Sequence, residues 1–150
     1  MSLDNVELVE SSYRLLAELR EGTPGTLEHA FGETFDERLE VCIPDAYPEG
    51  AQVFRGRDGL QRWIASNKEA WEEWRFEPER FLEAGDQVVV LVHVVARGGA
   101  SGIHLDRQTG HLWTIADGRV TRCEVYLDPS QAFQAVEVRE HAAQSRSAGG

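Results

Sequence analysis

The hydrophobic period of the chain changes at residue 75, and this change constrains the fold more than any other feature of the sequence. Before it, apolar residues recur at helical spacing. The clearest stripe, in segment 59–74, comprises Leu60, Trp63, Ile64, Asn67, Trp71 and Trp74. From residue 75 to about 127 the chain alternates between apolar and polar residues or runs continuously apolar, as strands do. Helices in the first half and strands in the second predict an α+β domain whose helices bury their stripes on one sheet face.

Local start and stop signals predict the individual elements. Asp4 and Glu7 form a capping box for a helix from about residue 5, which Gly22 ends. A second capping box, Asp58 with Gln61, precedes the 59–74 helix. We also expect a short helix ending at Gly32, strands over 39–44 and 51–56, and a last helix that contains Phe133 and Val136.

The second half of the chain predicts a curved sheet. Strands follow one another with short connections, and Asp117-Gly118 is typical of a two-residue hairpin turn. We therefore expect a cone-shaped half-barrel, in which a mixed or antiparallel sheet wraps around three helices of the N-terminal half and a C-terminal helix follows. A single domain over residues 1–143 and a disordered tail over 144–150 complete the prediction.

Composition excludes several classes of partner. The chain has 26 acidic and 15 basic residues and a net charge of −11, which repels nucleic acids and anionic lipid surfaces. Its N-terminus lacks the basic and apolar regions of a signal peptide, and its longest apolar run, 88–96, is too short to span a bilayer. These features predict a cytoplasmic protein that binds neither nucleic acid nor membrane.

Cysteines and histidines do not form a recognisable metal or redox motif. Cys42 and Cys123 lack CxxC spacing, so we expect reduced structural thiols. No HxH or HExxH spacing occurs among the histidines. We expect no metal and no cofactor.

Four segments resemble the SnoaL-like family of the nuclear transport factor 2-like superfamily, which also contains ketosteroid isomerase and limonene epoxide hydrolase. They are FRGRDGLQRWI, WEEWRFEPERFLEAGDQVVVLVHV, GGASG and HLWTIADGRVTRCEVYLD. The resemblance implies an open cone with a hydrophobic pocket, and usually a dimer. Because members include isomerases, cyclases, hydrolases and non-catalytic binders, the fold does not fix the reaction.

The catalytic groups of the two best-defined relatives are missing here. The epoxide hydrolase triad matches Val92, Val94 and Val125 of this chain. The acid, tyrosine and base of ketosteroid isomerase match positions near Gly110, Leu15 and Ile43.

This alignment also assigns the faces of the predicted sheet. Inward residues are expected to be Val88, Val90, Val92, Val94, Leu112, Thr114, Thr121, Cys123, Val125 and Leu127. The residues on the opposite face of these strands are His93, Val95, His111, Trp113, Glu124 and Tyr126. This outer face is too apolar to be fully exposed to solvent. We expect a homodimer through this outer face, with His93, Trp113, Glu124 and Tyr126 as contacts. In the alternative, the same residues line the active site, where His93, His111 and Glu124 could act as acid and base.

The expected pocket collects residues from the helices and the inward parity. They are Tyr13, Asp45, Trp63, Asn67, Trp71, Val92, Val94, Leu112, Thr114, Cys123 and Val125. Asn67 interrupts an apolar stripe, so its amide needs either a ligand or a backbone or water partner. Tyr13 is either pocket or ordinary core, and Asp45 is either a base at the pocket mouth or a solvated loop acid.

The sequence therefore favours a protein that binds a small hydrophobic molecule, of polyketide-like, steroid-like or terpenoid-like kind, in an apolar pocket. A catalytic version would be an isomerase or cyclase that transfers a proton with the help of Asp45, Tyr13 or Asn67. The alternative is a non-catalytic binding or dimerisation module.

Overall fold

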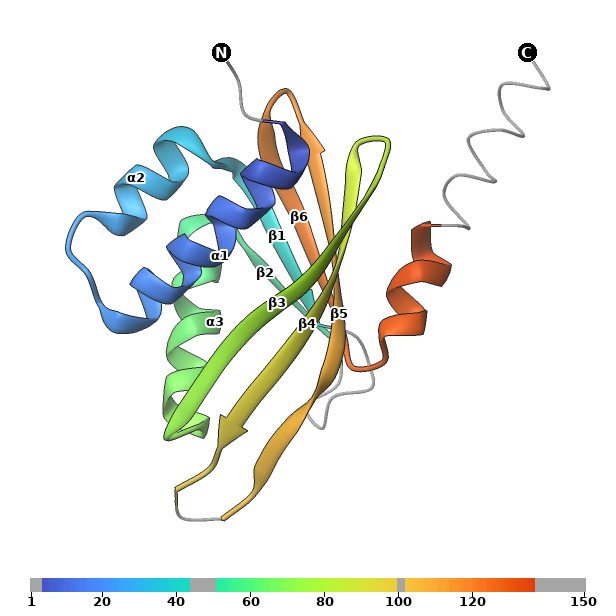
Figure 1. The fold of residues 1–150 in the computed structure, drawn as a ribbon. Helices are drawn as coiled ribbons and strands as arrows, with labels where there is room; N and C mark the ends of the chain where they lie inside the picture. The colour runs from blue at the N-terminus through green and yellow to red at the C-terminus, as the bar shows by residue number, and fades with distance from the viewer. Residues whose placement is uncertain (1–3, 44–50, 100–101, 137–150) are drawn as a thin grey trace.

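The structure is a computed structural model that describes residues 4–43, 51–99 and 102–136. Its elements, in chain order, are α1 (Asn5–Glu21), α2 (Thr26–Glu33), β1 (Phe35–Ile43), β2 (Gln52–Arg55), α3 (Gly56–Ala70), β3 (Glu73–Ala84), β4 (Gln87–Arg97), β5 (His104–Ala116) and β6 (Arg119–Tyr126). A short helix over residues 129–136 follows β6. Helices α1, α2 and α3 lie on one side of a curved sheet, and helix 129–136 lies on the other (Figure 1).

The six strands form one mixed sheet in the order β2-β1-β6-β5-β4-β3. β1 and β6 run parallel, whereas β3, β4, β5 and β6 follow one another as antiparallel neighbours. Register shifts interrupt the β1–β6, β3–β4 and β5–β6 ladders. Such bulges bend strands and increase their twist, so the sheet curves around the helices. The predicted α+β half-barrel is confirmed.

The first helix begins and ends as its sequence predicts. The Asp4 side chain accepts a hydrogen bond of 2.8 Å from the backbone N–H of Glu7. Gly22 adopts the left-handed conformation, with φ of 79°, and its N–H caps the last turn.

The boundaries of α3 differ from the prediction. The helix begins at Gly56 rather than after Asp58, and no side chain caps its N-terminus. It ends at Ala70 because Trp71 is extended, with φ of −123° and ψ of 132°. Trp74 therefore belongs to β3 and not to the helical stripe.

The main core fills the space between the helices and the concave face of the sheet. Val88, Val90, Val92 and Val94 of β4 belong to it, as predicted. Cys123 and Val125 of β6 also face this core. Burying these side chains is the main stabilising contribution of the sheet, at roughly 1.5–3 kcal/mol for each large aliphatic residue.

The predicted faces of β5 are wrong, and a bulge explains the error. A regular hairpin about Asp117-Gly118 pairs Leu112 with Cys123. In the structure an irregularity between Thr114 and Ile115 shifts the register, so Trp113 pairs with Cys123. A shift of one residue exchanges the two faces of a strand. As a result His111 and Trp113 point into the core, with 1% and 2% of their surfaces exposed.

Leu112 and Thr114 accordingly lie on the convex face and not in the pocket. Leu112 packs with Val89, Ala132 and Val136 in a second small core under helix 129–136. Thr114 accepts a hydrogen bond of 3.1 Å from the amide of Gln87. Trp113, predicted as a dimer contact, is a core residue.

Candidate functional site

A cavity of about 220 Å³ opens between α3 and the concave face of the sheet. The residues that line it are mostly apolar, and five of them are aromatic: Phe54, Trp63, Trp71, Trp74 and Phe76. The aliphatic walls are Ile43, Ala70, Val94, Ala96, Leu105 and Val125, and the polar ones are Gln52, Ser66, Asn67 and Thr109. A concave, largely apolar site with a few polar groups is typical of small-molecule binding sites.

Three of the aromatic walls form a packed cluster. Trp63 of α3 meets Trp74 edge-on, with centroids 5.5 Å apart, and stacks on Phe76 at 6.1 Å. Trp74 and Phe76 contact each other at 5.1 Å. The alternation of β3 places Trp74 and Phe76 on the same face two residues apart, so a period of two is the sequence signal that identifies them.

Asn67 lies on the cavity wall, but part of its side chain is already occupied. Its Nδ2 donates a hydrogen bond of 2.9 Å to the carbonyl oxygen of Trp63, one turn earlier in the same helix. The structure thus supplies a backbone partner for the amide, which is one of the two possibilities that the sequence leaves open.

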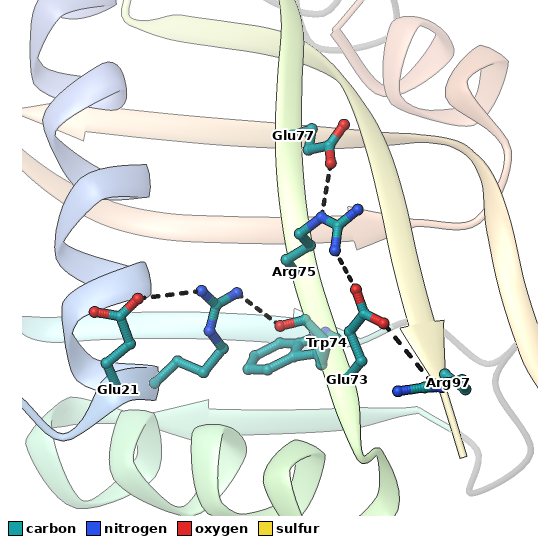
Figure 2. A network of polar contacts seen from close by, with 7 residues as sticks. Glu21, Glu73, Trp74, Arg75, Glu77 and Arg97 are labelled. Carbon is teal, nitrogen blue, oxygen red and sulfur yellow. Dashed lines mark hydrogen bonds and ion pairs between the residues drawn. The ribbon is translucent and has the colours of Figure 1, made fainter. Parts of the chain in front are cut away.

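A network of polar contacts links the start of β3 to α1 and β4 (Figure 2). Arg20 of α1 donates a hydrogen bond of 2.7 Å to the carbonyl oxygen of Trp74. Arg75, the next residue, contacts Glu77 and Glu73, and Glu73 reaches Arg97 on β4. Because the charges of Glu73, Arg75, Glu77 and Arg97 are solvent-exposed, each of these ion pairs contributes little to stability. Arg20 makes the contact that reaches the backbone of Trp74 itself.

Next to the cavity lies a buried polar chain of Tyr13, His111 and Trp113. The indole N–H of Trp113 donates to the Tyr13 hydroxyl at 2.9 Å, and that hydroxyl is 2.7 Å from Nδ1 of His111. An indole N–H only donates, so the indole N–H, the Tyr13 hydroxyl and Nδ1 of His111 all have partners when the hydroxyl donates its proton to Nδ1. The neutral imidazole then carries its own proton on Nε2.

Burial keeps this chain uncharged. Desolvation lowers the pKa of His111 to about 3, and it also raises the pKa of Tyr13 well above its ordinary value. Tyr13 is therefore a poor acid at neutral pH. Among the described residues, Nε2 of His111 has no hydrogen-bond partner.

The residues predicted for the pocket separate into five groups. Trp63, Asn67, Trp71, Val94 and Val125 line the cavity. Val92 and Cys123 face the core without lining it, and Tyr13 borders a smaller hollow of about 130 Å³ beside Trp74 and Phe76. Leu112 and Thr114 are on the opposite face of the sheet, and Asp45 lies outside the described residues.

The convex face carries the other ionisable groups considered from the sequence. His93 pairs with Asp106, and Glu124 accepts a hydrogen bond of 3.1 Å from the Tyr126 hydroxyl. The sheet separates Glu124 from His111, since alternate residues point to opposite faces. The acid and base constellation of His93, His111 and Glu124 therefore does not assemble.

Both cysteines are free thiols. Burial raises the pKa of Cys42 and that of Cys123, so both remain protonated at neutral pH. Within 4–43, 51–99 and 102–136, no cluster of three or more histidine, cysteine or acidic side chains is arranged to hold a metal ion. None of the described helices combines the length and apolarity needed to cross a membrane.

Comparison with known proteins identifies the class of this fold. The profile of the SnoaL-like domain matches residues 14–123, so the chain belongs to the SnoaL-like family. No curated protein matches the sequence.

Solved structures share the architecture. TerC, crystallised with polyporic acid, is 25% identical with a TM-score of 0.66, over 89% of this chain and 98% of that one. An NTF2-like protein of Burkholderia pseudomallei is 20% identical with a TM-score of 0.67, over 89% and 98% of the two chains. A protein of Jannaschia sp. CCS1 described as a SnoaL-like polyketide cyclase is 22% identical with a TM-score of 0.65, over 90% and 92%.

Proposed function

We propose that this protein binds a small, largely apolar molecule in the cavity between α3 and the sheet. The observation that carries the proposal is the cavity of about 220 Å³ with five aromatic walls. Aromatic walls favour flat ring systems, because rings stack or meet edge-on with indole and phenyl groups. Polyketide-like aromatic molecules therefore fit better than steroid-like or terpenoid-like ones. The complex of TerC with polyporic acid supports this preference.

The side chains that line the cavity support ligand binding without catalysis better than they support an enzymatic reaction. Among the described residues, the polar groups of the wall are the amides and hydroxyls of Gln52, Ser66, Asn67 and Thr109, and none of these four titrates near neutral pH. An isomerase or cyclase activity needs a titratable group at the cavity, and Asp45, which the sequence offers for that role, lies outside the described residues. The cytoplasmic location also stays a prediction from sequence.

Thermal shift with a panel of small aromatic molecules, polyporic acid included, tests the proposal. A ligand at 100 times its Kd adds about 2.7 kcal/mol to the free energy of unfolding. Ala96→Phe places a ring in the cavity and is expected to abolish the shift, since Ala96 is a buried wall residue. Ala65→Phe, on the exposed side of α3, is the matched control and retains it. A panel without any shift in the wild type contradicts the proposal.

A further inference from the structure

We propose that His111 is a specificity-determining residue, whose Nε2–H donates a hydrogen bond to a carbonyl oxygen of the bound molecule. The inference rests on the proposed function, because it assigns a chemical class, aromatic ketones or quinones, to the same cavity. His111 is buried, with only 1% of its surface exposed.

The protonation state of His111 follows from its partners. The Tyr13 hydroxyl is hydrogen-bonded to Nδ1 at 2.7 Å, and it accepts a hydrogen bond of 2.9 Å from the indole N–H of Trp113. The proton of the neutral ring is therefore on Nε2, which is a donor and not an acceptor. A buried donor without a partner is energetically costly, so an acceptor that reaches it gains more than it would at a solvated site.

His111 lies directly behind the cavity wall. Phe76 meets its ring edge-to-face, with centroids 4.9 Å apart and an interplanar angle of 85°. Thr109 precedes it by two residues on the same strand face, and Val125 is its cross-strand partner on β6. Phe76, Thr109 and Val125 all line the cavity.

Phe76 is the cavity wall that contacts the His111 ring. The Phe76 ring is only partly buried and borders the cavity, whereas His111 itself is not a lining residue. A ligand oxygen therefore reaches the imidazole only if the Phe76 ring moves aside. A carbonyl is the matching group, since it accepts without donating. A hydroxyl on the ligand matches less well, because its proton has no acceptor at Nε2–H.

The test compares two ligands of nearly equal size, tetralin and its ketone tetralone, by isothermal titration calorimetry. The two affinities are first corrected for the different free energies of transferring the ligands out of water. After this correction the wild type is expected to bind tetralone about 3- to 10-fold more tightly than tetralin. His111→Phe keeps an aromatic ring but no donor, so the preference disappears while tetralin affinity is retained. Ala65→Phe is the control that preserves both.

Nitrogen NMR of the wild type provides a readout that does not depend on the variant folding. A proton on Nε2 of His111 is expected in the free protein, and its resonance shifts with tetralone but not with tetralin. Tyr13→Phe removes the group that fixes the tautomer and is expected to reduce the ketone preference.

The outcomes separate the two proposals. If neither ligand binds wild type, the proposed function fails and this inference fails with it. If both bind with equal corrected affinity, or His111→Phe keeps the preference, the role of His111 is overturned while the binding function stands.

Discussion

His111 couples the stability of the folded protein to pH. Its pKa falls from 6.5 to about 3 on burial, so the unfolded chain binds a proton that the folded chain excludes. The contribution of the neutral, buried imidazole to the free energy of unfolding is complete above the pKa of the unfolded chain. This contribution is lost as the pH falls from there toward the pKa of the folded protein.

The expected result is a steeper loss of stability for wild type than for His111→Phe. Between about pH 7 and about pH 5 the difference grows by up to about 2 kcal/mol. Urea unfolding of both proteins at the two pH values measures it, and all other groups titrate alike in the pair. Parallel losses in the two proteins contradict the buried, neutral imidazole.

Single residues also show where prediction from sequence ends. The capping of α1 by Asp4 is local chemistry and is predictable. The cavity role of Phe76 follows from strand alternation once β3 is known to begin at Glu73. The inward orientation of His111 and Trp113 depends on one extra residue in a hairpin, which alternation alone does not reveal.

Helix 129–136 packs closely on the convex face of the sheet, and a glycine permits the contact. A Cβ placed on Gly110 lies 3.0 Å from Cα of Pro129 and 3.0 Å from Cβ of Ala132. One of these is a backbone atom, so the helix itself has to shift when a side chain is added.

Gly110→Ala is therefore expected to destabilise the protein by about 1–3 kcal/mol, as overpacking does. Gly32→Ala is the matched control, because no atom lies within 4 Å of its Cβ and it sits in α2. That control is expected to be neutral or stabilising by roughly 0.5–1 kcal/mol. Chemical denaturation measures both, and equal effects of the two substitutions contradict this packing.

Element boundaries reflect a competition between local and tertiary preferences. The helical stripe of 59–74 is real up to Ala70, after which Trp74 pairs with Ala96 in the sheet. Tryptophan and phenylalanine suit both a buried helix face and a strand, so spacing does not decide between them.

At the scale of the whole molecule, we propose that two copies associate through the convex face of the sheet. His93 and Tyr126 lie on this face, together with Val95 of β4. Helix 129–136 covers one part of the same face, over Leu112 and Val89. The remaining surface mixes apolar and polar groups, as the surfaces of protein interfaces do.

Val95→Glu is expected to convert a dimer into a folded monomer, because it places a charge in the contact. Gln61→Glu adds the same charge on the exposed side of α3 and is expected to leave the dimer intact. Sedimentation equilibrium distinguishes the two. Wild-type protein that is monomeric at micromolar concentration ends the proposal.

The cavity is a property of the whole molecule, because all six strands and α3 contribute to its walls. Three of the four tryptophans line it, whereas Trp113 lies in the core with its indole N–H bonded to Tyr13. A ligand in the cavity thus contacts a defined subset of indole rings.

Isotope-filtered NMR of the wild-type protein with saturating tetralin is the most direct measurement of this arrangement. Nuclear Overhauser contacts are expected from the ligand to the ring protons of Trp63, Trp74 and Phe76. No contacts are expected to Leu112 or Val89, which face helix 129–136 on the other side of the sheet. Contacts only with residues of the convex face, or none at saturation, contradict a ligand site between α3 and the sheet.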